Sequence, residues 1–296
     1  LNTLSLYYEH SQKLFIEPTD DPFIYQINPQ QQLTFTDEVQ QLQQSCDVTV
    51  GKTQQLQFGK LLLIFCLYNY SPKASTFLQI PPLMGHRGCG SDKKNKFMKS
   101  PRENSIQSFQ QAAQKVNSIE LDVILSKDLK LMINHNFQLN KQPICKTDSV
   151  NLELPTLQNV FDQIPVDSVV NVEIKYPKQA ADVDYFERQF VVDKVLQMQR
   201  ENIFYSSFDP MLCLLLQQSG KQVYFISCGL NALSSKLHHN LKKGIQFIEQ
   251  FNLDGVSVMG FSLKLHPGLF ADYQRKILIW RVNFDEQKLK EKYKAA

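Results

Sequence analysis

The sequence predicts an α/β protein, a TIM-type (β/α)₈ barrel preceded by a small all-β region. Three observations indicate this fold. Residues 1–78 contain short aromatic or β-branched runs separated by Pro and Gly, as strands and turns do. From Pro82 onward, apolar strand-like runs alternate with helical patterns, and this alternation predicts a parallel sheet covered by helices. The number of alternating units indicates a barrel.

We expect two domains, a β-rich N-terminal region over residues 1–78 and the barrel over residues 79–296. The pattern of the first domain indicates a small sandwich or an antiparallel platform. Its predicted strands are Leu4–Tyr8, Lys13–Glu17, Phe23–Ile27, Leu33–Thr36, Asp47–Val50 and Leu61–Tyr68. The last of these holds the most apolar run of the chain, which is far shorter than the roughly 20 residues of a spanning helix. We therefore expect no transmembrane segment.

In the second domain we count seven parallel strands. They begin near Leu83, Ile119, Val169, Ile203, Gln222, Leu253 and Ile277. The longer helices between them are predicted at Asn104–Val116, Thr156–Gln163, Asp184–Gln199, Pro210–Gln218 and Ser235–Phe251. The chain then ends in a polar helical pattern where an eighth strand should follow. Either that strand is absent from this chain or the count misses one, and we expect absence.

Composition limits the possible partners. The net charge of +3 is too small to indicate nucleic-acid binding, and the lysine-rich loop is interpreted as a solvated loop (Lys93, Lys94, Lys96 and Lys99). The six cysteines are scattered without a CxxC pair, as reduced thiols of a cytoplasmic protein are. The chain opens on Leu1 without a signal-peptide pattern, so we expect a fragment or a processed product.

The second barrel strand carries two carboxylates. Glu120 and Asp122 are two residues apart in an apolar run, so their side chains leave the strand on the same face. Only Ser126–Lys130 separate this strand from Leu131–His135, and that link is too short for a parallel crossover. We expect an antiparallel hairpin arm that carries His135 back over the carboxylates.

The carboxyl ends of the barrel strands should form the site. His86 ends the first strand, and Glu173 and Lys175 occupy the third, two residues apart. Three converging carboxylates offer hard oxygen ligands, which favour Mg²⁺ or Ca²⁺ over zinc. Arg87 and Lys175 would surround a phosphate. His86 and His135 have the right unperturbed pKa for a general base and a general acid.

Several motifs occur in order along these strands: GHRG, REN, ELDV, a hairpin histidine and EIK. Together they resemble the glycerophosphodiester phosphodiesterase family over roughly residues 83–283. The EIKYP and YSSFDP forms are most similar to the eukaryotic subgroup that cleaves glycerophosphocholine. The resemblance implies metal-dependent hydrolysis of a small glycerophosphodiester to glycerol 3-phosphate and an alcohol, through a cyclic phosphate.

The resemblance also implies roles for individual residues. It makes Glu120, Asp122 and Glu173 the metal ligands, His86 and His135 the acid–base pair, and Arg87 and Lys175 the phosphate contacts. Glu103 would lie at the site edge, where it positions Arg87 or the metal shell. Trp280, Phe208 and Tyr176 could form an aromatic wall for a quaternary ammonium group, or pack in the core. Asn136 departs from the family pattern, which usually has aspartate there.

Two other functions fit the same motifs. One is a non-catalytic relative that kept the pocket as a ligand-binding or regulatory module. The other is a lysophospholipase D type activity on a lipid, which needs an exposed apolar rim beside the site. Release of choline from glycerophosphocholine in the presence of Mg²⁺ or Ca²⁺ distinguishes an enzyme from a non-catalytic relative. Binding to lipid vesicles tests the lysophospholipase D type activity.

Overall fold

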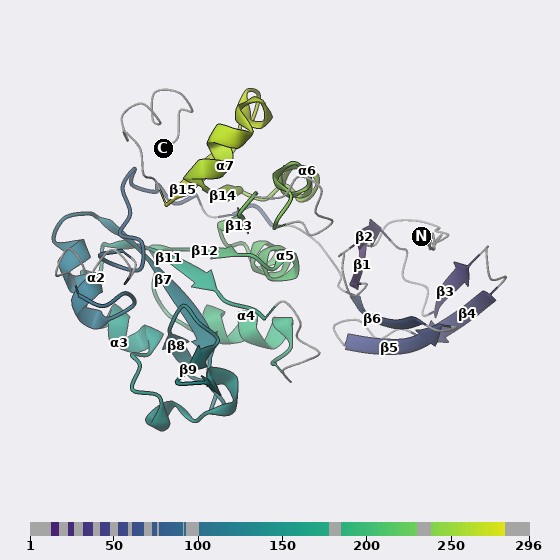
Figure 1. Ribbon diagram of the computed structural model, residues 1–296, viewed down its shortest axis with the longest axis horizontal. Helices are drawn as coiled ribbons and strands as arrows, with labels where there is room; N and C mark the ends of the chain where they lie inside the picture. The colour runs from purple at the N-terminus through teal and green to yellow at the C-terminus, as the bar shows by residue number, and fades with distance from the viewer. Residues whose placement is uncertain are drawn as a thin grey trace. The chain divides into compact units, whose positions relative to one another are not determined.

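The computed structural model describes the six strands of the N-terminal region and residues 73–75, 77–90, 92, 101–177, 185–229 and 238–281. The chain divides into two compact units, one formed mainly by residues 1–71 and the other mainly by residues from 72 onward. Figure 1 shows the elements of both. The predicted strand at Leu4–Tyr8, the lysine-rich loop and the polar C-terminal pattern lie outside the described residues.

The first unit consists of antiparallel strands. Its strands are β1 (Lys13–Glu17), β2 (Phe23–Gln26), β3 (Gln32–Asp37), β4 (Leu42–Asp47), β5 (Thr53–Phe58) and β6 (Leu61–Leu67). They form a sheet in the order β2-β1-β6-β5 and a separate β3–β4 pair. The predicted all-β character is therefore confirmed for the described strands. The strand predicted at Asp47–Val50 overlaps β4 at Asp47, and its residues 48–50 lie outside the described residues. Most of β4 and all of β5 were not predicted. Both are rich in glutamine, and their backbone pairing with β3 and β6 outweighs this weak strand propensity.

The second unit is built on one sheet in the order β15-β14-β13-β12-β11-β7-β8. The strands are β7 (Ser118–Leu125), β8 (Leu131–Ile133), β11 (Val169–Ile174), β12 (Ile203–Ser207), β13 (Val223–Ser227), β14 (Gly255–Met259) and β15 (Lys276–Trp280). All neighbours are parallel except β7 and β8, which confirms the predicted hairpin arm. A smaller hairpin, β9 (Gln138–Leu139) with β10 (Gln142–Pro143), follows β8.

The first predicted barrel strand is reduced to a single parallel bridge between Gly85 and Ile119. Six parallel strands of the sheet and this bridge account for the seven predicted units. Within the described part of the chain, no strand pairs with the edge of β15 away from β14, so the barrel is open there. The residues after Arg281 are not described, and the absence of an eighth strand stays a prediction.

Helices cover the parallel sheet (Figure 1). They are α2 (Ile106–Ala113), α3 (Leu157–Phe161), α4 (Arg188–Leu196), α5 (Pro210–Gln218), α6 (Leu241–Phe251) and α7 (Gly260–Leu265), with 3₁₀ turns at Ile144–Lys146, Ser149–Asn151 and Pro267–Phe270. The predicted bounds of α5 are confirmed, since Asp209 caps its first turn before Pro210. The other helices begin later than predicted; α2 and α6 start directly after the capping residues Ser105 and Asn240. No helix in the described ranges is long and apolar enough to span a membrane.

The core fills the amino-terminal end of the barrel. Val169, Phe204 and Tyr224 lie at the starts of three neighbouring strands and pack with Ile80. The rings of Phe204 and Tyr224 meet edge to face, with centroids 5.4 Å apart. Full burial of one such side chain stabilises the fold by about 1.5–3 kcal/mol. Apolar side chains thus close this end, and the polar side chains of the same strands lie towards the carboxyl end.

Candidate active site

Three carboxylates lie together on β7 and β11. The parallel register places Asp122 opposite Glu173, and Glu120 two residues earlier projects to the same face. One ligand oxygen from each group lies within 4.8 Å of the others. Asp122 is fully buried and Glu120 is 6% exposed. The structure therefore brings together the three residues that the sequence grouped, in the arrangement expected of a cation site.

Glu120 is only partly satisfied. Its Oε2 accepts a hydrogen bond from the backbone N–H of Arg87 at 2.7 Å, whereas its buried Oε1 has no hydrogen-bond partner among the described residues. Burial raises the pKa of this carboxyl well above its usual value, and the charges of Asp122 and Glu173 raise it further. A buried carboxylate oxygen without a partner is costly, so a bound cation fits this position.

Asp122 is held in its charged form by several partners. Lys175 Nζ lies 2.9 Å from one oxygen and Arg87 Nε lies 3.3 Å from the other. Asn104 Nδ2 donates to the carboxylate at 2.8 Å and Asn104 Oδ1 accepts from the Asp122 backbone N–H at 3.3 Å. Burial would raise the pKa of Asp122, but Lys175 and Arg87 outweigh it and the pKa is lowered.

Asn104 is a site residue that the sequence reasoning missed. It is buried, has a positive φ of 55°, and donates its backbone N–H to the carbonyl of Arg87 at 3.1 Å. Asn tolerates this left-handed conformation better than most residues. The signal available in the sequence was the REN motif, in which only Glu103 was given a role.

The GHRG turn brings Arg87 to the carboxylates. Arg87 and Gly88 both have positive φ, 52° and 82°. A Cβ on Gly85 would lie 2.7 Å from the carbonyl oxygen of Gly88, and one on Gly88 would lie 2.4 Å from Ser108 Oγ on α2. The two glycines therefore permit a tight turn against α2. That turn directs the Arg87 backbone N–H towards Glu120 and its guanidinium towards Asp122.

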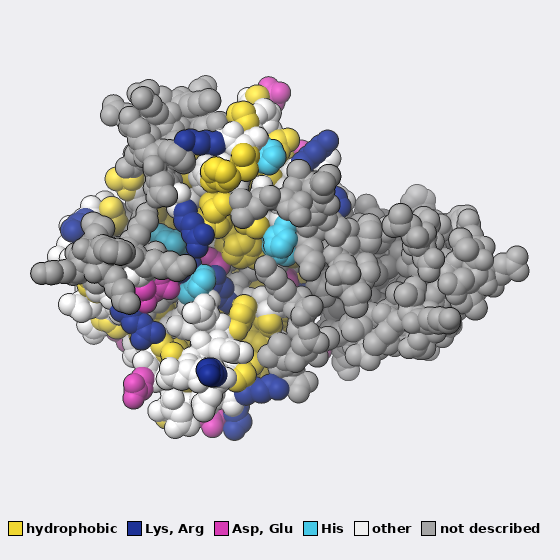
Figure 2. Space-filling model, in the orientation of Figure 1, with side chains coloured by type: hydrophobic (Ala, Val, Ile, Leu, Met, Phe, Trp, Pro, Cys, Tyr) yellow, Lys and Arg dark blue, Asp and Glu magenta, His cyan; other side chains and the backbone are white. Residues whose placement is uncertain are grey.

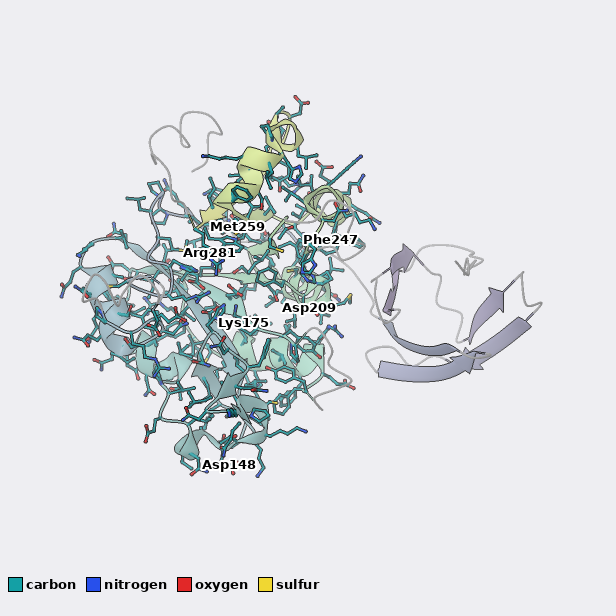
Figure 3. The ribbon with its side chains drawn as sticks, viewed as in Figure 1. Asp148, Lys175, Asp209, Phe247, Met259 and Arg281 are labelled. Atoms are coloured by element: carbon teal, nitrogen blue, oxygen red, sulfur yellow. The ribbon has the colours of Figure 1, made fainter. Side chains whose placement is uncertain are left out.

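The two basic residues are fixed by acidic neighbours. Arg87 Nη1 also contacts Glu103 Oε1 at 3.1 Å, so Glu103 lies at the site edge and holds the guanidinium. Lys175 Nζ is hydrogen-bonded to Glu173 and paired with Asp122. Burial would lower the pKa of Lys175, but the carboxylates of Glu173 and Asp122 outweigh it and raise the pKa. Lys175 therefore stays charged beside the carboxylates. Its position is labelled in Figure 3.

Both predicted histidines are near this cluster. His86 Nε2 lies 4.0 Å from Glu120 Oε2, with a third of the side chain exposed. Burial and then Arg87 lower the pKa of His86 to about 4. His135 follows β8, and burial and then Lys175 lower its pKa as well. Both rings are thus neutral at pH 7 and able to accept a proton. Figure 2 shows histidine, acidic and basic side chains gathered around an apolar area on one face.

The three aromatic candidates differ in their surroundings. Tyr176 stacks under the guanidinium of Arg188 at 4.6 Å and donates its hydroxyl hydrogen bond to the Phe186 carbonyl at 2.9 Å, so it is a packing residue. Phe208 lies beside the site, since Lys175 Nζ is 5.8 Å from its ring centroid. Trp280 ends β15, where Arg281 lies 5.5 Å from its ring.

The open parallel barrel and its site define a class of protein. Carboxylates, basic side chains and neutral histidines meet at the carboxyl ends of the strands, where the active sites of TIM-barrel enzymes lie.

Comparison with known sequences finds similarity to one family. The sequence model of the glycerophosphoryl diester phosphodiesterase family matches residues 86–143. A putative glycerophosphocholine phosphodiesterase GPCPD1 homolog 1 of Caenorhabditis elegans is 26% identical over 217 residues, 50% of this chain and 31% of the relative. Human glycerophosphocholine phosphodiesterase GPCPD1 is 23% identical over 266 residues, 68% and 40% of the two chains. The resemblance to this family and to its eukaryotic glycerophosphocholine subgroup is confirmed. The chain spans less than half the length of these two relatives.

Solved structures show the same fold. A glycerophosphodiester phosphodiesterase of Thermotoga maritima aligns with a TM-score of 0.55 at 23% identity, over 74% of this chain and 94% of that one. An Oleispira antarctica phosphodiesterase in complex with the product sn-glycerol-3-phosphate aligns with a TM-score of 0.55 at 17% identity, over 72% and 90%. The predicted TIM-barrel fold class is confirmed.

Proposed function

We propose that this chain hydrolyses glycerophosphodiesters, with glycerophosphocholine as the favoured substrate, to glycerol 3-phosphate and an alcohol. The observation that carries the proposal is the buried carboxylate cluster, in which Glu120 Oε1 has no hydrogen-bond partner among the described residues, flanked by two fixed basic side chains and two neutral histidines. The names of the curated relatives and the product bound in the Oleispira antarctica structure support it.

Glu120, Asp122 and Glu173 would hold one divalent cation, Mg²⁺ or Ca²⁺. With Glu103, which is paired with Arg87, four carboxylates face the positive charges of Arg87 and Lys175, so acidic groups are in excess. A divalent cation would offset this excess and allow an anionic diester to bind. When bound, the cation supplies positive charge to the phosphoryl oxygens as negative charge develops on them.

The side chains of the chain then share the remaining tasks. Arg87 and Lys175 contact the phosphate, since both are charged and held in place. One histidine accepts the proton of the glycerol hydroxyl as its oxygen bonds to phosphorus. The other donates a proton to the leaving alcohol as the old P–O bond breaks, and the anionic phosphate favours its charged form. Water then opens the cyclic phosphate, and the two histidines exchange roles.

The test is choline release from glycerophosphocholine by purified protein with Mg²⁺ or Ca²⁺, before and after EDTA. We expect turnover that EDTA abolishes and that His86→Ala lowers by a factor of about 10²–10⁴. His266→Ala, at the C-terminal end of α7, serves as the matched control. No cation-dependent turnover by folded protein, with His86→Ala indistinguishable from wild type, would contradict the enzyme and favour a ligand-binding relative.

A second candidate is a lysophospholipase D type activity. The observation that favours it is a pair of apolar side chains on α7, Phe261 and Leu265, which are 50% and 49% exposed. They lie four residues apart, so they share one face of the helix that follows the carboxyl end of β14. Choline release from lysophosphatidylcholine, together with vesicle binding that Phe261→Ser removes, would support this candidate. Turnover of the water-soluble diester alone would reject it.

A cytoplasmic location is part of the same proposal. The described cysteines are free thiols, and Cys213 is fully buried on α5. Burial raises the pKa of that thiol well above its usual value, which keeps it unreactive. Reduced cysteines without a pairing pattern support a reducing compartment. Cell fractionation of the full-length protein is the direct test.

A further inference from the structure

We infer that Asn136 fixes the tautomer of His135, keeping the neutral ring's proton on Nδ1 and leaving Nε2 as the acceptor nitrogen. Asn136 is then a positioning residue for the histidine. The catalytic consequence rests on the proposed function, whereas the tautomer follows from the contacts of these residues alone.

The first step is the contact between the two side chains. His135 Nδ1 lies 3.2 Å from Asn136 Oδ1. A carboxamide oxygen can only accept a hydrogen bond, so Nδ1 must carry the proton that is shared. A neutral imidazole has one N–H, and its second nitrogen is then an acceptor. Nε2 is therefore the nitrogen with the free lone pair.

The second step is what holds Asn136 in place. Asn134 Nδ2 donates to the backbone carbonyl of Asn136 at 2.7 Å, and the Asn134 backbone N–H donates to the Asp122 carbonyl at 3.1 Å. Asn134 is 9% exposed, and it follows directly on β8, which pairs with β7. The turn that carries His135 and Asn136 is thus tied to the strand that carries the carboxylates.

The third step concerns charge. Lys175, after β11, and Arg87, in the GHRG turn, oppose a positive charge on His135, and Asp122 on β7 favours it. His86, also in the GHRG turn, faces His135 closely enough for His135 to lower its pKa. Asn136 orients the ring without adding a negative charge. Aspartate in its place would accept the same Nδ1 hydrogen bond and would also stabilise the protonated ring. The Asn136→Asp substitution therefore keeps the orientation of the His135 ring and changes only the charge beside it.

The consequence for the reaction is a division of roles. A neutral His135 with a free Nε2 lone pair can accept a proton from a hydroxyl directly, because the ring does not first have to lose a proton. Substrate-free protein therefore has His135 ready as the base. With aspartate at position 136, a larger fraction of the ring would be protonated at pH 7, and activity would need a higher pH.

The experiment is long-range ¹H–¹⁵N correlation NMR of the histidine rings in the uniformly ¹⁵N-labelled chain at pH 7.5, with His135→Gln used to assign the His135 signals. We expect the Nδ1–H pattern in wild type and in Asn136→Asp. We expect a shift towards the Nε2–H pattern in Asn136→Ala, and also in Asn136→Leu, which fills the space without an acceptor. An Nε2–H pattern in wild type, or an unchanged pattern in both apolar variants, would overturn the inference.

Titration and kinetics supply the second measurement. Asn136→Asp should raise the titration midpoint of the His135 signals by about one pH unit. If the chain turns over glycerophosphocholine, the rising limb of its kcat/KM profile against pH should move up by a similar amount. The NMR pattern needs no substrate, so a chain without turnover refutes the proposed function and still decides the tautomer. An unmoved titration midpoint in Asn136→Asp would contradict the contact between the two side chains.

Discussion

At the scale of single residues, Glu120 is a buried acidic side chain with an unsatisfied oxygen. Its Oε1 is buried without a hydrogen-bond partner in the described part of the chain, and two further carboxylates lie beside it. Such a group destabilises the cation-free fold, because no hydrogen bond or cation compensates for the charge repulsion and the lost hydration. The same features would stabilise the fold on binding of the proposed cation. Removal of the Glu120 carboxyl should therefore raise the stability of the cation-free protein and weaken binding of the cation.

We predict that Glu120→Gln stabilises the cation-free protein by about 1 kcal/mol, because it removes a carboxyl whose ionisation burial opposes and keeps an acceptor for the Arg87 N–H. It should also abolish stabilisation by Ca²⁺ or Mg²⁺. In wild type that stabilisation should reach about 2.7 kcal/mol at a hundredfold excess over Kd. Thermal unfolding with each cation and with EDTA measures both effects.

Glu249→Gln, on the exposed face of α6, is the matched control and should behave as wild type. A Glu120→Gln variant that still gains stability from the cation would show that the ion binds elsewhere.

A second residue-scale prediction concerns the GHRG turn. Gly88→Ala should destabilise the fold by about 1–3 kcal/mol, because φ is 82° and the new Cβ would lie 2.4 Å from Ser108 Oγ and 2.7 Å from the Ser108 backbone carbon. Gly268→Ala is the matched control, because nothing lies within 4 Å of its added Cβ, and it should change stability by less than about 0.5 kcal/mol. Urea unfolding of both variants gives the comparison. Equal stability of the two would show that the turn can relax.

At the scale of elements, the sequence predicted the hairpin arm and the carboxylate pair for a simple reason. Both follow from strand alternation and from a link too short for a crossover, which are local properties. The contacts that fix Arg87 and Asn104 were not predictable in this way. They depend on positive φ values and on the approach of α2 to the turn, which are tertiary features. The polar strand β5 was missed because its strand state comes from its neighbour.

The hairpin link itself carries a pH-dependent stabilisation. Asp128 accepts hydrogen bonds from Ser126 Oγ at 2.7 Å and from the Ser149 backbone and hydroxyl at 2.8 and 2.6 Å. The Ser149 hydrogen bonds, partly opposed by burial, lower the pKa of Asp128 from 3.8 to about 2. Because the folded pKa is the lower one, its contribution is complete above the unfolded value and is lost as pH falls through the folded value.

We therefore predict that Asp128→Asn lowers stability at pH 7 by less than about 1 kcal/mol, since the carboxylate is exposed and screened by water. The difference from wild type should shrink between pH 4 and pH 2, about the range between the unfolded and folded pKa values. Asp148→Asn, which removes an exposed pair with Lys127, is the control and should show no measurable change. Urea unfolding of the three proteins across this range tests the sign. A difference that grows as pH falls would refute the assignment.

At the scale of the whole molecule, the class of fold could be predicted because the strand–helix alternation is regular and the strands are largely apolar. The buried pattern of β7, β12, β13 and β14 matches those runs. The exact boundary between the two units could not be predicted in the same way. It depends on which residues of the connecting segment pack on the barrel, and the sequence there has no strong periodicity.

The contacts of that connecting segment lead to the last prediction. Ser75 Oγ donates to Asp254 Oδ1 at 2.6 Å, the backbone N–H of Leu78 donates to Gln222 Oε1 at 3.1 Å, and Leu78 packs on the core at the amino-terminal end of the barrel. A fragment of residues 72–296 keeps these contacts, whereas one of residues 79–296, the predicted domain, loses them. We expect the longer fragment to be more stable by about 2–3 kcal/mol, from two hydrogen bonds and part of one leucine side chain. Urea unfolding of both fragments measures the difference. Ser75→Ala and Gln222→Ala in the longer fragment should each reproduce part of the loss, and equal stability of the two fragments would place the boundary at residue 79.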